Sequence, residues 1–84
     1  MLEIELCKGK GKAIIDKKFS DVVAGKVYYL SAGGYAIRRI KTNKKWKLIL
    51  LHREIIDASD KDGNKTRFIN GNKLDCRLEN MEVK

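Results

Sequence analysis

Proline is absent from the sequence, and cysteine, histidine and tryptophan are scarce, with two, one and one residues. The cysteines, Cys7 and Cys76, lie far apart and match no paired C-x-x-C spacing, which argues against a zinc site and favours a reduced, intracellular protein. No apolar stretch approaches the length of a membrane span, and the N-terminus lacks the basic flank and apolar core of a signal peptide. We therefore expect a cytoplasmic protein that is not secreted and does not enter a membrane.

Acidic residues are also in the minority. The chain has 19 Lys and Arg against 11 Asp and Glu, a formal net charge of +8 and a pI of about 9.7. An excess of this size favours a polyanionic partner, most often nucleic acid, and the alternative is a basic surface that serves only solubility. The length of 84 residues, with 43% hydrophobic residues, predicts a single domain (1–84) with a small core, and argues against a catalytic cleft between two domains.

The first quarter of the chain predicts a hairpin and a brief helix. Residues 2–6 alternate apolar with acidic side chains, which is the period of a half-buried strand, and residues 13–16 form a second apolar strand. The glycines and lysines at 8–12 lack the spacing of a phosphate-binding P-loop, so we expect a flexible basic hairpin tip there. Asp16 or Ser20 could cap a short helix before Gly25.

Three more strands are predicted at residues 27–30, 35–41 and 45–51, and the last two form a hairpin around a short polar loop. In one register of this hairpin the inward side chains are Trp46, Leu48 and Leu50. The outward side chains are then Lys45 and Lys47, which makes that face cationic. Arg38 and Arg39 occupy opposite faces of their strand, so only one of them can share the cationic face, and either is possible.

The last third of the chain predicts a helix, a polar loop, and a strand and turn followed by another helix. The first helix starts at residues 52–56, and the polar loop spans 57–64. A calcium-binding EF-hand with its sixth-position glycine at Gly63 would need oxygen ligands at positions 58 and 69. These positions hold Ala58 and Ile69, so we exclude calcium. The turn Asn70-Gly71-Asn72 precedes three apolar residues on one helical face and Asp75 in the first turn, where the helix dipole favours an anion. The three apolar residues are Leu74, Leu78 and Met81.

Three segments together resemble the phage-type HNH endonucleases that carry an AP2-like β-sheet. They are GYAIRR at 34–39, LHREII at 51–56 and INGNKLD at 69–75, the last followed by Arg77, Glu79 and Asn80. The resemblance covers roughly residues 8–82. It implies an α+β fold, in which a small antiparallel AP2-like sheet packs with a short helix over about 8–56 and grips the duplex. A ββα (HNH-like) finger over 57–84 would hold one divalent metal ion in active relatives.

The sequence departs from this family where the reaction takes place. The family pattern has a metal-binding Asp and a general-base His where this chain has Arg67 and Phe68. A phenyl ring cannot accept a proton, and a guanidinium repels the cation that an acidic oxygen would bind. Asn80 matches one metal-ligand position and is at most a vestigial ligand, while Cys76 replaces a structural Asn. We expect no cofactor, no bound metal and no catalysis, and a structural role for His52.

These observations lead to the hypothesis of a nuclease-dead HNH-like protein that binds double-stranded DNA mainly through phosphate contacts. Arg67 would meet the phosphate that a metal ion holds in active relatives. The expected DNA-binding residues are Arg38, Arg39, Lys41, Lys45, Lys47, Arg53, Arg67, Lys73 and Arg77.

Two alternatives remain open at this stage. The first is a protein-interaction module, such as an inhibitor of a host nuclease encoded by a phage or mobile element, with Phe68 in an exposed contact patch. Burial of Phe68 would favour a role in the core instead. The second is residual metal-dependent nicking of DNA through Asn80, His52 and an unidentified acid.

Overall fold

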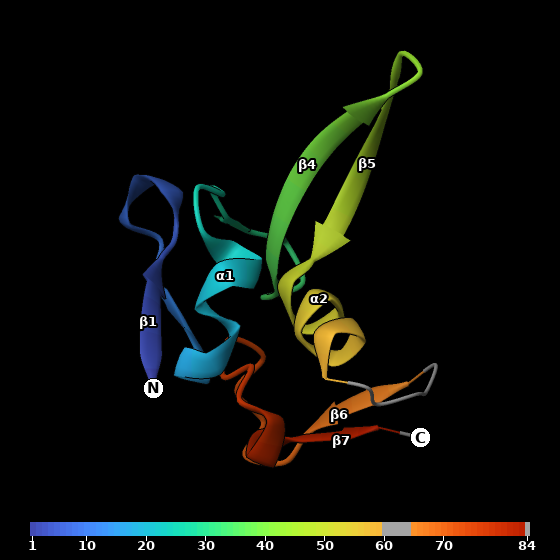
Figure 1. The fold of residues 1–84 in the computed structure, drawn as a ribbon. Helices are drawn as coiled ribbons and strands as arrows, with labels where there is room; N and C mark the ends of the chain where they lie inside the picture. Colours follow the sequence, from blue (N-terminus) through green and yellow to red (C-terminus); the bar gives the residue numbers. More distant parts are fainter. Residues whose placement is uncertain (60–64, 84) are drawn as a thin grey trace.

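The computed structural model describes residues 1–59 and 65–83, and these form short strands and helices around one core (Figure 1). The strands are β1 (Leu2–Glu5), β2 (Lys12–Ile15), β3 (Tyr29–Leu30), β4 (Ala36–Thr42), β5 (Lys45–Leu50), β6 (Thr66–Phe68) and β7 (Met81–Val83). The helices are α1 (Ser20–Val23) and α2 (Leu51–Ala58), with 3₁₀ turns at Cys7–Gly9, Lys17–Phe19 and Leu78–Asn80. The pairs β1–β2 and β6–β7 and the three-stranded order β3–β4–β5 are all antiparallel, which confirms an α+β fold with antiparallel sheets.

The first hairpin and the brief helix form as predicted. β1 and β2 pair from Leu2 opposite Ile15 to Glu5 opposite Lys12, and the acidic side chains of β1 are exposed while its apolar ones are half-buried. Their connection turns sharply through residues with positive φ, among them Gly9. Asp16 makes no capping bond to the helix, because its carboxylate accepts a hydrogen bond from the Leu78 amide at 3.0 Å instead.

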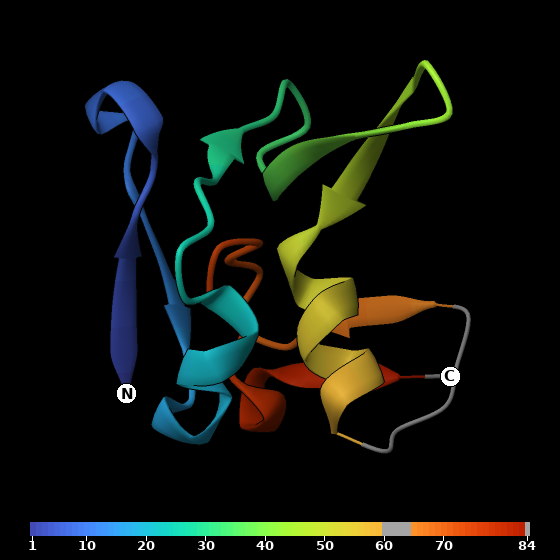
Figure 2. The ribbon, with the colours of Figure 1, turned by 45° about the horizontal axis from the view of Figure 1, so that its top comes forward.

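The core lies between the first hairpin, the two α-helices and the segment that precedes β7. Its largest fully buried side chains are Leu6, Ile15, Tyr28, Leu51, Ile55, Ile56 and Cys76. The i, i+4 spacing of Leu51 and Ile55 puts both on the inner face of α2, and α1 packs against α2 (Figure 2). The predicted helix is therefore confirmed, although it extends to Ala58 where a loop was expected; the rest of that loop, 60–64, lies outside the described residues.

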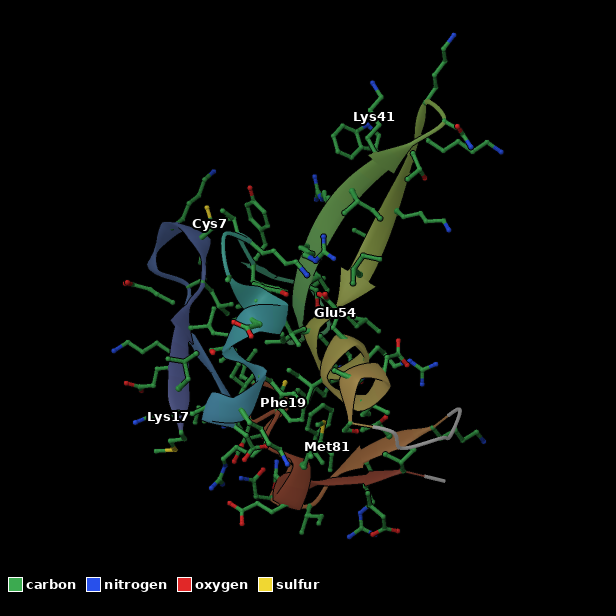
Figure 3. All side chains as sticks on the ribbon, in the orientation of Figure 1. Cys7, Lys17, Phe19, Lys41, Glu54 and Met81 are labelled. Carbon is green, nitrogen blue, oxygen red and sulfur yellow. The ribbon has the colours of Figure 1, made fainter. Side chains whose placement is uncertain are left out.

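The β4–β5 hairpin projects from this body, and its tip extends well beyond α2 (Figures 1 and 2). Trp46 is 68% exposed and Leu48 63% exposed, so the prediction that both point into the core is wrong. The register puts Leu48 opposite Arg39 and Trp46 opposite Lys41, which Figure 3 labels near the tip of the hairpin. The alternation along the strand is as predicted, but Trp46 and Leu48 lie on a stretch of this face that the other described residues leave exposed.

The helix expected after Asn72 is also wrong. In the described part of the chain, β6 is followed by an irregular segment, one 3₁₀ turn and then β7, which pairs with β6. The Leu74 carbonyl accepts a hydrogen bond from the Ile14 amide, and the Cys76 amide donates to the Ile14 carbonyl, each at 2.8 Å. Because these groups bond to β2, they are not available for the ladder of a helix. The observed motif is a β-hairpin rather than a complete ββα finger.

Candidate nucleic-acid interface

The exposed cations of the β4–β5 hairpin lie on both of its faces and at its tip. In an antiparallel pair, residues opposite one another share a face. Lys41 and Arg39 therefore lie on the face of Trp46 and Leu48, whereas Lys45 lies opposite Thr42 on the other face, as does Lys47 opposite Ile40. Lys44 lies in the turn, with φ at 66°. These five cations are Arg39, Lys41, Lys44, Lys45 and Lys47, and all are exposed.

This charge is not balanced locally. Residues 36–50 contain six Lys and Arg and no Asp or Glu, so this one segment carries +6 of the formal net charge of +8. Among the described residues, none of the five exposed hairpin cations forms an ion pair. The hairpin is thus a concentrated source of positive potential held away from the body.

The two neighbouring arginines of β4 have different surroundings. Arg38 donates from Nε to Glu54 Oε1 at 2.9 Å and from Nη2 to Oε2 at 3.1 Å, so its guanidinium is held at the base of the hairpin. Glu54, which Figure 3 places between α2 and that base, also accepts from Lys26 Nζ at 3.1 Å and from the Tyr28 hydroxyl at 2.8 Å. Arg39 faces solvent. By register Arg38 lies on the face of Lys45 and Lys47, but its guanidinium is bound to Glu54, whereas Arg39 is exposed on the face of Trp46 and Lys41.

The cluster around Glu54 is charged in the folded protein. Burial alone would raise the pKa of this carboxyl, but the hydrogen bonds from Arg38, Tyr28 and Lys26 outweigh burial and leave the pKa below its ordinary value. Burial and the bond to Glu54 raise the pKa of the Tyr28 hydroxyl, which remains a neutral donor. One carboxylate thus fixes the first turn of α2 to β4 and to the segment before β3.

The remaining predicted DNA contacts lie elsewhere. Arg77 binds Asp75 with Nε–Oδ1 and Nη2–Oδ2 distances of 2.7 Å, and its Nη1 contacts Glu79 at 2.7 Å, so its charge is compensated locally. Lys73 donates to the Gly33 carbonyl at 2.8 Å, and its ammonium lies 4.9 Å from the Tyr35 ring centroid.

Two further predicted contacts, Arg53 and Arg67, come from α2 and β6. Arg53 is half-buried, whereas Arg67 is exposed and lies opposite Glu82 on β7. In Figures 1 and 2 the β6–β7 hairpin lies beyond α2, at the end of the molecule away from the β4–β5 tip. The nine predicted residues do not form one surface, and four of them lie together as exposed cations on the β4–β5 hairpin: Arg39, Lys41, Lys45 and Lys47.

Phe68, which the resemblance places where a general base would stand, is part of an aromatic cluster. The half-buried Phe68 ring meets the His52 ring edge-on, with 5.2 Å between centroids, and Tyr35 lies 5.5 Å from His52 and 6.3 Å from Phe68. Phe68 also packs against the buried core. Burial first, and the charge of Arg53 second, lower the pKa of His52. This cluster is consistent with the structural role expected for His52, and it favours a core role for Phe68 over an exposed contact patch.

Asn80 fixes the loop between β6 and β7. Its Oδ1 accepts from the Asn70 amide at 3.0 Å, and its Nδ2 donates to Asn70 Oδ1 at 3.0 Å and to the Asp75 carbonyl at 2.9 Å. Asn80 and Asp75 are both buried. The hydrogen bonds from Arg77 act against burial to hold the pKa of Asp75 below its usual value. The amide that could be a vestigial metal ligand is thus engaged in closing the loop.

Cys76, which the resemblance places at a structural Asn, lies fully buried beside this loop. Burial, with a smaller effect from Asp75, raises the pKa of its thiol to about 12, so it remains protonated and apolar in character. Within residues 1–59 and 65–83, no group of three or more His, Cys, Asp or Glu side chains is arranged to hold a metal ion.

Sequence reasoning missed three exposed lysines near this surface. Lys44 was assigned only to a turn, although the tip of a projecting hairpin is the part that a partner reaches first. Lys8 and Lys10, at the tip of the first hairpin, line a groove that extends to β4 and Trp46. Nothing in the local pattern links residues 8–10 to the β4–β5 hairpin, because only the fold brings them together.

Comparisons with models of protein families, with curated proteins and with solved structures found no match. In the described part of the chain, no helix has both the length and the apolar character needed to cross a membrane.

Proposed function

We propose that this protein binds double-stranded DNA through phosphate contacts from the β4–β5 hairpin and does not cleave it. The observation that carries the proposal is the projecting ribbon whose exposed cations, from Arg39 to Lys47, have no acidic residue between them. Phosphate contacts supply most of the affinity that does not depend on sequence, and they require Lys and Arg side chains that can reach the backbone.

The shape of the hairpin fits this role. The major groove of B-DNA is about 12 Å wide and admits a two-stranded β-ribbon. A ribbon in the groove has a phosphate backbone on either side, so cations on both faces and at the tip, such as Lys41, Lys45 and Lys44, would each have a phosphate within reach. Phosphate contacts fix position rather than sequence, so we expect weak sequence preference.

The absence of cleavage follows from the residues at the position of the reaction. Phe68 cannot take a proton from water, and Arg67 cannot bind a metal cation. The proposal retains Arg67, which is exposed on β6, as a separate phosphate contact distant from the hairpin. Arg67→Ala should lower affinity for all DNA sequences alike, and an unchanged binding constant would remove this contact from the proposal.

A salt titration of duplex binding tests the proposal. If the five exposed hairpin cations each neutralise one phosphate, the logarithm of the binding constant should fall against the logarithm of salt concentration with a slope of about −4 to −5. Fluorescence anisotropy of a labelled duplex would measure this. No binding at low salt, or a slope near zero, would contradict the proposal.

A second candidate function, inhibition of a nuclease by protein contact, is favoured by the exposed Trp46 and Leu48. These two side chains and Arg39 line a shallow hollow on the hairpin, and exposed Trp and Arg residues often supply binding energy at protein interfaces. If the protein inhibits the nuclease by direct contact, inhibition should be complete when its concentration matches that of the nuclease, whatever the DNA concentration, and Leu48→Asp should abolish it. If inhibition instead rises with the fraction of DNA that the protein covers, the result would support DNA binding.

A further inference from the structure

We propose that the groove beside the β4–β5 hairpin binds a single-stranded nucleic acid, with unpaired bases stacked on Tyr29 and Trp46. This goes beyond the duplex contacts proposed for the hairpin, because it concerns a different ligand and a groove that adjoins the hairpin and shares Arg39 with the proposed duplex contacts. The groove measures about 740 Å³ and lies between the tip of the first hairpin, residues 25–30 and the β4–β5 hairpin. In Figure 2 these three parts, blue, blue-green and green to yellow, all lie at the same end of the molecule.

The walls of the groove carry one sign of charge. Among the residues that the structure describes, five cations and no Asp or Glu line it, and these cations are Lys8, Lys10, Lys26, Arg38 and Arg39. Glu54 neutralises part of this charge from the side of α2, since it binds both Lys26 and Arg38. The exposed Lys8, Lys10 and Arg39 form no ion pair among the described residues. The groove therefore favours a ligand with several negative charges along its length.

The same groove exposes flat apolar surface, which a simple anion would not use. Tyr29 is 41% exposed and Trp46 is 68% exposed, and both line the groove with Leu30. Tyr29 pairs with Ile37 and Trp46 with Lys41, so both rings lie on the sheet face that also carries Arg39, which is placed between them along β4. Two aromatic rings on either side of a guanidinium form a surface on which successive bases can stack.

The cationic walls and the exposed aromatic rings together indicate which class of ligand fits the groove. A duplex offers phosphates but keeps its bases paired and stacked, so it cannot use the rings of Tyr29 and Trp46. An acidic peptide offers charge but few flat rings. Single-stranded DNA or RNA offers both a charged backbone and unpaired bases, and stacking on aromatic side chains is tolerant of sequence.

The chain contains its own probes of this groove. Trp46 is the only tryptophan, so its fluorescence reports directly on base stacking. Cys7 lines the groove and is partly exposed, whereas Cys76 is fully buried, so an uncharged maleimide should modify Cys7 alone in the folded protein. Figure 3 places Cys7 at the tip of the first hairpin and Lys17 at its opposite end, which makes Lys17 a control for charge at a distance.

The experiment measures Trp46 fluorescence and the alkylation rate of Cys7 in the full chain with an oligothymidylate of about eight nucleotides, an abasic strand of equal length, and a blunt duplex. Oligothymidylate should quench Trp46, slow alkylation of Cys7 several-fold and bind about 5-fold to 100-fold more tightly than the abasic strand. Equal binding by the abasic strand, or equal protection of Cys7 by the duplex, would overturn the proposal. Duplex binding without protection of Cys7, together with failure of oligothymidylate to bind, would overturn it while leaving the proposed function intact.

Matched variants test the two components of the site separately. Tyr29→Ala should lower affinity for oligothymidylate about 5-fold to 100-fold while duplex affinity stays unchanged, because Tyr29 is not on the β4–β5 hairpin. Lys10→Ala should weaken single-strand binding, and Lys17→Ala, with the same change in charge, should not. Modification of Cys76 would reveal any variant that has lost its fold. If Tyr29→Ala and Lys17→Ala keep Cys76 protected and bind oligothymidylate equally well, the proposal is wrong.

Discussion

Arg38 binds Glu54 through nitrogen–oxygen contacts of 2.9 and 3.1 Å, while its neighbour Arg39 lies on the opposite, exposed face of β4. Consecutive arginines on one strand thus have different functions. The first connects the base of the hairpin to α2, and the second is available to a ligand. This relationship separates the residues that stabilise the fold from those that we propose bind DNA.

Truncating each of these two arginines should give opposite results. Arg38→Ala should lower the free energy of unfolding by about 1–3 kcal/mol, since it removes charge-assisted hydrogen bonds from a mostly buried carboxylate. Arg39→Ala should change it by less than about 0.5 kcal/mol and should weaken duplex binding. Urea denaturation and anisotropy would measure the two effects. Equal destabilisation by both variants would show that the assignment of roles is wrong.

The Asn80 side chain should be important for stability, because it makes three hydrogen bonds within the β6–β7 loop while buried. Asn80→Ala should lower the free energy of unfolding by about 2–4 kcal/mol, as donors and acceptors in the loop lose their partner. Asn72→Ala is the matched control. The exposed Asn72 side chain accepts one hydrogen bond within the described residues, from the Leu74 amide at 3.0 Å, so its loss should cost about 1 kcal/mol or less. A larger cost for Asn72→Ala than for Asn80→Ala would contradict this account of the loop.

Stability should decrease on mild acidification because of His52. Burial and the charge of Arg53 hold the pKa of His52 below its ordinary value of 6.5, so the unfolded chain takes up the proton more readily than the folded one. The contribution of neutral His52 to stability is therefore complete above pH 6.5 and is lost as the pH falls from there toward the folded-state pKa. The urea midpoint should be lower at about pH 5.5 than at about pH 7.5. His52→Gln should flatten this difference, and an unchanged pH dependence in that variant would assign the effect to other groups.

We expect no metal-dependent cleavage of DNA. Phe68 packs against His52 and Tyr35 and cannot act as a general base, and the Asn80 amide is hydrogen-bonded within its loop. A supercoiled plasmid incubated with the protein and Mg²⁺ or Mn²⁺ should remain uncut. Nicking that requires the metal and is lost in a folded Asn80→Ala variant would instead support residual nuclease activity.

The elements that the sequence predicted well depend on local patterns. Alternation at residues 2–6 predicted β1, and the sequence at residues 52–56 predicted the start of α2, without reference to the rest of the chain. The helix expected from Leu74 failed because the same apolar spacing also suits a loop that bonds to β2 through Ile14. Periodicity does not distinguish these cases, since the deciding hydrogen bonds join segments about 60 residues apart.

Prediction of the DNA-binding surface from the sequence was limited for the same reason. The cations of the β4–β5 hairpin could be recognised from their spacing, but whether Trp46 faces the core depends on how far α2 extends beneath the ribbon. The choice between Arg38 and Arg39 depends on the position of Glu54, which is 16 residues away in sequence from Arg38. The groove with Lys8 and Lys10 depends on how two hairpins lie in space, which no local pattern encodes.

The most direct test of the central claim compares the salt dependence of duplex binding in two double variants with equal charge change. In Lys45→Gln with Lys47→Gln, the log–log slope should become shallower by about 2, following the rule of roughly 0.9 per phosphate contact. In Lys12→Gln with Lys17→Gln, which changes exposed lysines away from the hairpin, the slope should stay as in the unmodified protein. If both double variants changed the slope equally, overall charge rather than the β4–β5 hairpin would hold the DNA, and the account would be contradicted.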